Sequence, residues 1–367
     1  MKILFIADDF SEGGAASVCH SLINALASDE IQPVAASLDG IGCLGEQLKK
    51  QGIPFYFLDR KPGLDYSLFF RIREIIRKER IEIVHLHQYT SFFYGSIGSL
   101  LAGNRRIIFT EHGREVPDLV RPKRVIVNKL VVPFIKEVIA VSQSVKKSLT
   151  ELEKIPAERI RVLLNGIDTT PLDRKFDSIA KRKELGISEE APVAAIVARL
   201  CDYKNHAKLF EAWKTVTEQL PEAVLLVIGG GPMESELKRL SESIPGIAFT
   251  GVRHDVPELL AAVDIVTLCS FYEGTSITLL EAMAAAKAVV ASRVAGNLEV
   301  VKEGETGLLV SPENPGEIAS ALLRLLKDRR LSIQMGQAGK KRQQELYSLE
   351  EMVSSYRKLY FSAAGNL

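Results

Sequence analysis

The chain alternates short apolar runs with segments of helical periodicity, and this alternation constrains its fold more than any other feature. In the first half we expect strands at Lys2–Ala7, Val34–Leu38, Pro54–Leu58, Ile81–Leu86, Ile107–Thr110, Val138–Val141 and Arg161–Leu164. In the second half we expect them at Val193–Val197, Val224–Ile228, Ile247–Thr250, Ile265–Leu268, Ala288–Ala291 and Leu308–Val310. Strands separated by helices form parallel sheets through right-handed crossovers. The sequence therefore predicts an α/β fold.

The alternation breaks between residues 165 and 185, where Asn165-Gly166 is a turn signal and a polar stretch with Pro171 follows. A length of 367 residues suits two domains. We predict two Rossmann-like, doubly wound domains over residues 1–168 and 169–345, followed by a terminal helix within 346–367. Ligands bind at the carboxyl ends of strands in open α/β sheets. We therefore expect the two domains to face a central cleft that holds the site.

Composition excludes several classes of protein. The net charge of +1 gives no reason to expect nucleic acid as a partner. The four cysteines are far apart and lack the spacing of a metal or redox site. The N-terminus resembles a signal peptide, but Asp8 and Asp9 interrupt its apolar run. No apolar run in the chain approaches the roughly 18 residues of a membrane span. We expect a cytoplasmic protein that can still lie on the inner face of the membrane.

The most specific segment is Phe271–Met283, which leaves an apolar strand and turns through Gly274 into a helix. The first turn is expected to include Thr275, Ser276 and Ile277, whose N–H groups and helix dipole favour an anion. Glu273 and Glu281 flank that position, and carboxylates accept hydrogen bonds from hydroxyl groups. A nucleotide diphosphate sugar fits this arrangement. A plain helix with solvated glutamates is the alternative.

Two further groups of residues follow predicted strands. Arg199 and Lys204 lie five residues apart after the strand Val193–Val197, where they can close on a diphosphate, or can be ordinary solvated cations. His112 follows the strand Ile107–Thr110 and can bind a sugar hydroxyl, or can be a buried structural histidine.

Other histidines and glycines carry weaker signals. We expect His85 and His87 to face opposite sides of their strand, with His85 packing and His87 lining the cleft. Gly13-Gly14 lacks the dinucleotide fingerprint and is either a tight turn or a place of close ligand approach. The run 229–231 is expected to be a flexible glycine loop or a turn. No Walker lysine or Asp-x-Asp pair occurs, so we expect neither nucleotide hydrolysis nor a metal on the diphosphate.

The stretch from Arg121 to Lys136 mixes five cations with many apolar residues. It is either an amphipathic helix for an anionic membrane surface or a domain helix with solvated basic residues.

Taken together, these residues resemble glycosyltransferase family 4, the retaining, nucleotide-sugar-dependent enzymes of GT-B architecture. The likeness covers nearly the whole chain and is densest from Ala198 to Val310. Its Glu-x7-Glu motif is met by Glu273 and Glu281. Other matching stretches are Val141-Ser142, residues 165–168, 251–253 and 296–299.

The resemblance implies a role for each matched residue. Arg199 and Lys204 would bind the diphosphate, Glu281 the ribose, and Glu273 the hydroxyls of the transferred sugar. The backbone around Arg253 would border the base, and His112 would contact the transferred sugar. Gly13-Gly14 would form the family's glycine loop. The last helix would pack back on the first domain. No cofactor is expected besides the donor, with UDP preferred and GDP next.

The chain departs from the family pattern at several positions. Thr275-Ser276 replaces a frequent Phe/Leu-Pro, and Ala286 and Ala295 replace usual glycines. Since every expected charged residue is present, we expect an active hexosyltransferase that acts on a glycan or lipid-linked acceptor. The alternatives are a GT-B-fold epimerase that transfers nothing and a non-catalytic partner subunit.

Overall fold

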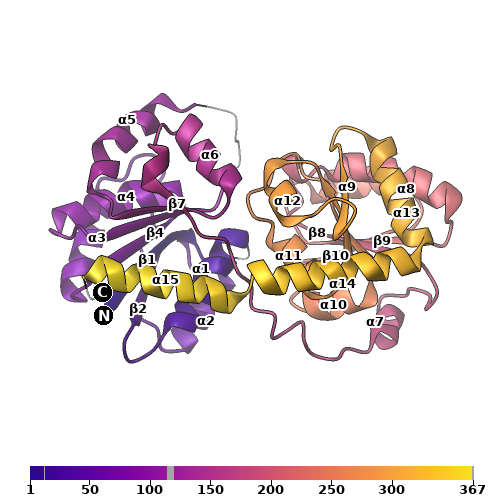
Figure 1. The fold of residues 1–367 in the computed structure, drawn as a ribbon, viewed down its shortest axis with the longest axis horizontal. Helices are drawn as coiled ribbons and strands as arrows, with labels where there is room; N and C mark the ends of the chain where they lie inside the picture. The colour runs from indigo at the N-terminus through magenta and orange to yellow at the C-terminus, as the bar shows by residue number, and fades with distance from the viewer. Residues whose placement is uncertain (12, 114–119, 366–367) are drawn as a thin grey trace. The chain divides into compact units, whose positions relative to one another are not determined.

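The computed structural model describes residues 1–11, 13–113 and 120–365 (Figure 1). The chain forms two compact units. The first is Met1–Ile167 together with the C-terminal segment that begins at Leu349, and the second is Asp168–Ser348. The first unit is therefore discontinuous in sequence.

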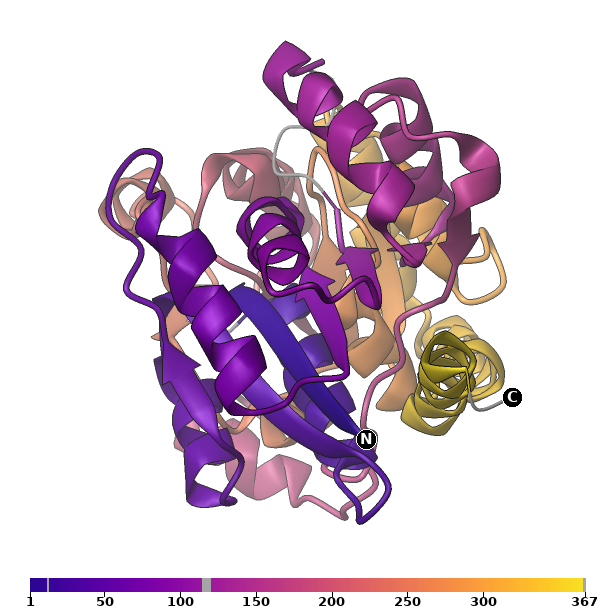
Figure 2. The same ribbon diagram turned by 90° about the vertical axis from the view of Figure 1, so that its left-hand side faces the viewer.

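The N-terminal unit is built on a seven-stranded sheet in the order β3-β2-β1-β4-β5-β6-β7, with every pair of neighbours parallel. Figure 2 turns this unit toward the viewer. The strands are buried on both faces, which is why they are continuous apolar runs in the sequence. Their bounds are β1 Lys2–Asp9, β2 Gln32–Gly40, β3 Phe55–Phe57, β4 Ile83–His87, β5 Ile107–Glu111, β6 Glu137–Ala140 and β7 Ile160–Val162.

Helices cover both faces of this sheet. Alternate residues of β1 point to opposite sides: Leu4 and Ile6 join a large apolar cluster, while Phe5 contacts Tyr360 on the other side. The helices are α1 Gly14–Leu26, α2 Gly42–Lys50, α3 Ser67–Lys78, α4 Tyr89–Leu101, α5 Pro122–Val131, α6 Gln143–Glu151 and α15 Leu349–Ala364, with short 3-10 turns η1 Val132–Phe134 and η2 Ala157–Arg159.

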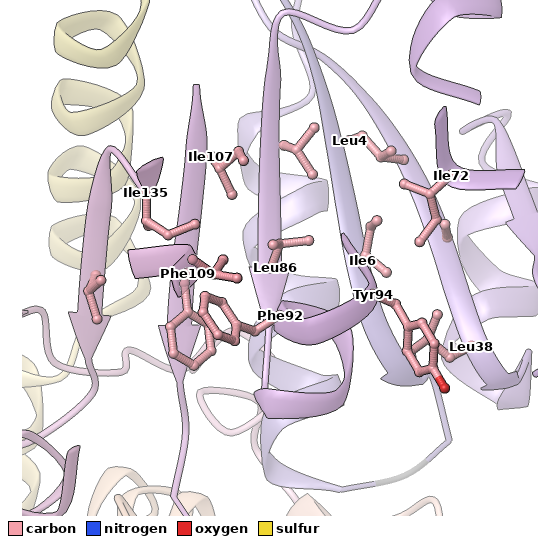
Figure 3. Close-up of a cluster of buried hydrophobic side chains, with 14 of the residues drawn as sticks. Leu4, Ile6, Leu38, Ile72, Leu86, Phe92, Tyr94, Ile107, Phe109 and Ile135 are labelled. Carbon is pink, nitrogen blue, oxygen red and sulfur yellow. The ribbon is translucent and has the colours of Figure 1, made fainter. Parts of the chain in front are cut away.

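Figure 3 shows the centre of that cluster, where side chains from neighbouring strands meet those of α3 and α4. The rings of Phe92 and Phe109 lie 4.3 Å apart between centroids, and Leu86 and Ile6 are fully buried. Burial of each such side chain stabilises the folded state by about 1.5–3 kcal/mol. This packing fixes the positions of the strand ends that carry the candidate site residues.

The second unit has a six-stranded parallel sheet in the order β10-β9-β8-β11-β12-β13. The strands are β8 Val193–Val197, β9 Val224–Ile228, β10 Ile247–Gly251, β11 Ile265–Leu268, β12 Ala288–Ser292 and β13 Gly307–Val310. The helices are α7 Ser178–Glu184, α8 His206–Gln219, α9 Glu234–Ser241, α10 Val256–Ala262, α11 Ile277–Ala284, α12 Ala295–Val300, α13 Pro315–Lys327 and α14 Arg329–Leu346, with the 3-10 turn η3 Asp202–Lys204. In both sheets the order reverses beside the first strand, as in a doubly wound fold.

Candidate functional site

The second unit gathers most of the candidate residues at the carboxyl end of its sheet. Strands β8 and β11 are hydrogen-bonded neighbours, so the loops that follow them leave the sheet side by side. One loop carries Arg199 and Lys204 and the other carries Glu273 and Gly274. The sheet therefore brings together two segments that lie about seventy residues apart in the chain.

Lys204 and Glu273 form an ion pair between these loops. The Nζ atom of Lys204 lies 2.6 Å from Oε1 of Glu273, and the two side chains are only 16% and 9% exposed. A pair with so little exposure is screened less by salt than a surface pair. A ligand phosphate here would compete with Glu273 for the ammonium group of Lys204.

Two tyrosines that were not among the predicted site residues, Tyr203 and Tyr272, hold these loops together. The rings of Tyr203 and Tyr272 stack with centroids 5.3 Å apart and an angle of 13° between their planes. The backbone N–H of Phe271 donates to the carbonyl oxygen of Tyr203 at 2.8 Å. The signal was present in the sequence, because a tyrosine directly precedes both Lys204 and Glu273.

Helix α11 begins at this site with Ile277, so that Thr275 and Ser276, which were expected in its first turn, precede it. Ser276 is its N-cap, and the Ser276 hydroxyl accepts a hydrogen bond from the N–H of Leu279. Thr275 precedes the helix and Ile277 is its first residue. Thr278 Oγ1 donates to the carbonyl oxygen of Val197 at 3.0 Å, which ties the first turn to the end of β8. The positive end of the α11 dipole thus lies beside the Lys204 loop.

The glycine of α12 allows the Glu273 loop to adopt its path. A Cβ atom on Gly296 would lie 1.6 Å from the carbonyl oxygen of Gly274 and 2.5 Å from that of Glu273. Ala295, where the family's usual glycine is missing, is exposed, so its methyl group does not lie in this contact. The close approach therefore depends on Gly296 and not on Ala295.

Glu281 lies on α11 and is partly buried. Burial raises the pKa of its carboxyl group to about 7. The carboxyl group makes no hydrogen bond or ion pair with any residue that the structure describes. A half-ionised carboxyl group without a partner suits a ligand that brings its own hydroxyl donors.

Arg199 lies two residues after the end of β8 and differs from Lys204 in its surroundings. Its side chain is exposed and makes no ion pair within the described part of the chain. The glycine run 229–231 beside it is a closely packed turn, one of the two alternatives expected from the sequence. Cβ atoms on Gly229 and Gly231 would collide with the carbonyl oxygens of Ala198 and Leu200, so close packing accounts for these glycines.

The side chain of Arg253 is occupied by an ion-pair network. It lies 2.6 Å from Asp255 Oδ2 and 3.1 Å from Glu184 Oε1, and Lys181 pairs with the same two carboxylates. Hydrogen bonds from Arg253 hold the pKa of Asp255 below its ordinary value. Only the backbone near Arg253 is thus left for a ligand.

In the N-terminal unit, the glycine loop precedes α1. Gly13 is the N-cap of α1, Gly14 is its first residue, and the carbonyl oxygen of Gly13 accepts from the N–H of Ser17 at 2.9 Å. Among the described residues, a Cβ atom on Gly13 would meet nothing within 4 Å. Packing alone therefore does not explain the glycine there.

The prediction that His85 and His87 face opposite sides of their strand is wrong. Residues two apart in a strand share a face, and the two rings lie 4.1 Å apart. His85 packs as expected: its ring nitrogens lie 2.7 Å from Tyr360 Oη and 2.8 Å from Thr110 Oγ1. His87 Nδ1 lies 2.9 Å from Nε2 of His112.

Two carboxyl groups at this end of the N-terminal sheet were also missed. Asp8 accepts hydrogen bonds from the N–H and hydroxyl groups of Ser91, and burial raises its pKa. Burial raises the pKa of Glu111 to about 7, and the N–H of Gly113 donates to it. Their positions could have indicated them, since each directly follows a predicted strand.

No cluster of histidine, cysteine and carboxylate side chains suited to a metal ion occurs in residues 1–11, 13–113 and 120–365. Within the same residues, no helix combines the length and the apolar character needed to cross a bilayer.

Two parallel, doubly wound α/β units with charged loops at the strand ends fit the GT-B architecture, and the comparisons show that the chain is a glycosyltransferase of this architecture. A model described as "Glycosyltransferase Family 4" matches residues 12–171, and one described as "Glycosyl transferases group 1" matches residues 177–342. The chain belongs to glycosyltransferase family 4.

Individual relatives resemble the chain over most of its length. N-acetyl-alpha-D-glucosaminyl L-malate synthase of Bacillus anthracis is 27% identical over 89% of this chain and 94% of its own. UDP-Gal:alpha-D-GlcNAc-diphosphoundecaprenol alpha-1,3-galactosyltransferase of Escherichia coli is 27% identical over 73% and 72%. The fold matches Anabaena Alr3699/HepE in complex with UDP and glucose, with a TM-score of 0.83, 20% identity and coverage of 99% and 100%.

Proposed function

We propose that this chain transfers a hexose-type sugar from a UDP-sugar to a glycan or lipid-linked acceptor, with retention and without a metal ion. A GDP-sugar is the second choice of donor. The reaction would serve the synthesis of a cell-surface polysaccharide or glycolipid. The observation that carries the proposal is the Lys204–Glu273 pair beside the first turn of α11.

The leaving group sets the main physical demand. When the bond between the sugar and the phosphate breaks, negative charge develops on the departing diphosphate. Lys204, Arg199 and the N-terminus of α11 stabilise that charge, because fixed cations and dipoles need no reorganisation during the reaction. Lys204 exchanges its partner from Glu273 to the diphosphate, and Glu273 then accepts hydrogen bonds from sugar hydroxyls.

Retention follows from attack on the face that the leaving group vacates. The acceptor hydroxyl oxygen forms the new bond to the anomeric carbon as the bond to phosphate breaks. The acceptor proton passes to a phosphate oxygen of the leaving group, so no protein base is needed. Glu281 binds the ribose hydroxyls, the backbone near Arg253 borders the base, and His112 binds the transferred sugar.

The choice of donor and acceptor is supported by relatives. HepE is seen with UDP and glucose, and the Escherichia coli relative carries UDP-Gal and a diphosphoundecaprenol-linked acceptor in its name. Pro122–Val131, in the first part of the basic stretch for which a membrane surface was one of two alternatives, forms α5. Ile126 and Leu130, one turn apart on α5, are 59% and 67% exposed, and Lys123 and Lys129 beside them are exposed. Such a face suits anionic lipid.

The proposal is tested by a thermal-shift screen of UDP- and GDP-sugars, followed by product analysis. A donor at 100 times its Kd stabilises the folded chain by about 2.7 kcal/mol. NMR of the product with an α-linked donor should show an α-linkage, and EDTA should leave turnover unchanged. Release of nucleotide or epimerised sugar without acceptor reports hydrolysis or epimerisation. Absence of any shift and of any calorimetric heat would refute the proposed function.

A further inference from the structure

A cavity lies at the amino end of the second sheet, the end opposite to the loops that carry Lys204 and Glu273. Its volume of about 540 Å³ falls within the roughly 300–1,000 Å³ typical of small-molecule sites. Its walls come from α7, the segment before β8, the end of α10, the turn before β12, the end of α13 and the start of α14. We propose that this cavity binds a phosphate group, free or in a small phosphate ester, through Arg329, Lys287 and Ser332. This site is separate from the one that the proposed function uses.

Arg329, the first residue of α14, supplies a cation that the protein itself leaves available. Its side chain lines the cavity, is exposed, and forms no hydrogen bond or ion pair with any residue that the structure describes. A guanidinium group can donate two parallel hydrogen bonds to a phosphate, and it stays charged at every physiological pH. An unpaired arginine is common on a surface, so the argument depends on what shares its cavity.

Ser332 lies one turn further along α14, on the same side of the helix as Arg329. The residue is only 6% exposed and lines the cavity, and its hydroxyl group has no hydrogen-bond partner within the described part of the chain. Buried hydroxyl groups nearly always have a partner. Because the Asp328 side chain already caps this helix by accepting from the N–H of Leu331, the site does not depend on the helix terminus. The unused hydroxyl of Ser332 therefore points to a ligand.

Lys287, in the turn before β12, brings a second cation to the cavity. Its Nζ atom donates to the carbonyl oxygens of Val263 at 2.8 Å and Ala261 at 3.4 Å, which leaves one ammonium hydrogen for a ligand. Burial lowers the pKa of Lys287, and the positive charges of Arg182 and Arg329 act in the same direction. A bound phosphate would offset this repulsion among the three cations.

The carboxylates of the cavity leave Lys287 and Arg329 unneutralised. Asp264 is engaged by Arg182, whose Nη2 donates to it at 3.2 Å. The other nitrogens of Arg182 donate to three backbone carbonyl oxygens, so this arginine is structural. Glu189 and Glu190 are exposed on the segment before β8, and neither forms an ion pair with a cation of the cavity.

Two isoleucines give the same cavity an apolar side. Ile179 of α7 and Ile333 of α14 line it and are 52% and 54% exposed. Small-molecule sites combine such apolar walls with a few polar groups that fix the ligand. The carbon skeleton of a phosphate ester can pack on these side chains while its phosphate contacts Arg329, Ser332 and Lys287.

Equilibrium dialysis of the full-length chain tests the site. The probes are 32P-labelled inorganic phosphate and 32P-labelled glucose 6-phosphate, with UDP present to fill the proposed donor site. We expect the chain to retain both probes and to bind the ester more tightly. Arg329→Ala should weaken retention by about tenfold or more, the loss expected for a hydrogen bond to a charged group, and Ser332→Ala should weaken it too. Arg330→Ala, a neighbouring exposed arginine outside the cavity wall, is the matched control and should change nothing.

Several results would overturn the proposal. These are retention of neither probe, equal losses in Arg329→Ala and Arg330→Ala, and retention of labelled glucose as tight as that of its phosphate. Retention that disappears when UDP is added would assign the phosphate to the donor site instead. Inorganic phosphate bound as tightly as the ester would identify the free ion as the ligand, and a tighter ester would identify a phosphate ester. The comparison of the two arginine variants decides the point even if the chain transfers no sugar.

Discussion

The ammonium group of Lys204 lies 2.6 Å from the carboxylate of Glu273, although 69 residues separate them in sequence. The contact exists because β8 and β11 are neighbours and their following loops leave the same edge of the sheet. Without a ligand, each residue neutralises the other. In the proposed function, a diphosphate replaces Glu273 as the partner of Lys204, and Glu273 then accepts hydrogen bonds from the sugar.

Lys204→Ala should lower kcat/KM by roughly a hundredfold or more, the effect of losing a group that stabilises charge in the transition state. The matched control is Lys208→Ala on α8, which removes an exposed lysine paired with Glu211. Steady-state kinetics with EDTA present provide the measurement. Unchanged turnover in Lys204→Ala would contradict the proposed charge arrangement.

Gly296→Ala should destabilise the second unit by about 1–3 kcal/mol, as overpacking does, and weaken donor binding. Its Cβ atom would meet the backbone of Gly274. Ala295→Gly, one residue earlier and exposed, serves as the control and should have little effect on either. Urea denaturation and calorimetry with UDP measure the two effects. Wild-type stability in Gly296→Ala would show that the contact is not tight.

Ala286→Gly should raise stability by about 0.5–1 kcal/mol. Ala286, two residues after the end of α11, has φ 56°. This left-handed conformation costs a residue with a Cβ atom about 1–2 kcal/mol, and the greater freedom of glycine in the unfolded chain offsets part of the gain from Ala286→Gly. The N–H groups of Ala286 and Lys287 donate to Met283 and Ala282 in a Schellman motif.

Ala285→Gly, at φ −75°, is the comparison and should lower stability by a similar amount. Thermal melts of both variants give the answer. A loss in Ala286→Gly equal to that in Ala285→Gly would refute the argument from conformation.

The stability of the chain should fall as pH rises through the titration of Glu281. Its pKa is about 7 when folded and near 4.5 in an ordinary environment. Between these values the folded chain holds a proton that the unfolded chain has released, so its contribution is complete below about pH 4.5 and lost by pH 7.

Urea midpoints of Glu281→Gln at pH 5, 6, 7 and 8 should therefore show a smaller decline than those of the wild type. Glu305→Gln, which changes an exposed carboxylate, is the charge-matched control. Parallel pH profiles for wild type and Glu281→Gln would show that the carboxyl group is not perturbed.

The exposed face of α5 should bind anionic vesicles. Replacing Ile126 and Leu130 by serine removes two exposed apolar side chains and should weaken co-sedimentation with phosphatidylglycerol vesicles by about tenfold or more. Leu240→Ser on α9, also exposed, is the control. Equal binding to neutral and anionic vesicles would remove the membrane proposal.

The sequence predicts the strands well because buried parallel strands are short apolar runs, and Val224–Ile228 and Ile265–Leu268 have the predicted bounds. Helix α14, which was not predicted, lacks an apolar stripe. Its buried face includes the small residues Gly336 and Gly339, which approach α11 and the turn after it closely. Periodicity of large apolar residues cannot reveal such a helix.

The charged residues of the candidate site could be predicted from the sequence, but the residues with which they form ion pairs could not. Lys204 and Glu273 could be selected from motif and strand order. The engagement of Arg253 by Asp255 and Glu184 depends on the meeting of two helices that no local pattern encodes. The shared face of His85 and His87 was predictable from strand geometry, and the error lay in applying that geometry.

Helix α15 packs against the first unit although the whole second unit is translated before it. Tyr356, which hydrogen-bonds to Thr110, and Tyr360, which hydrogen-bonds to His85, are therefore synthesised only after the second unit. A nascent chain that has reached residue 167 has no such cover for one side of its central strands. Expression of residues 1–167 alone should yield a fragment that aggregates, and the N-terminal unit can reach its native state only after residues 349–364 have left the ribosome.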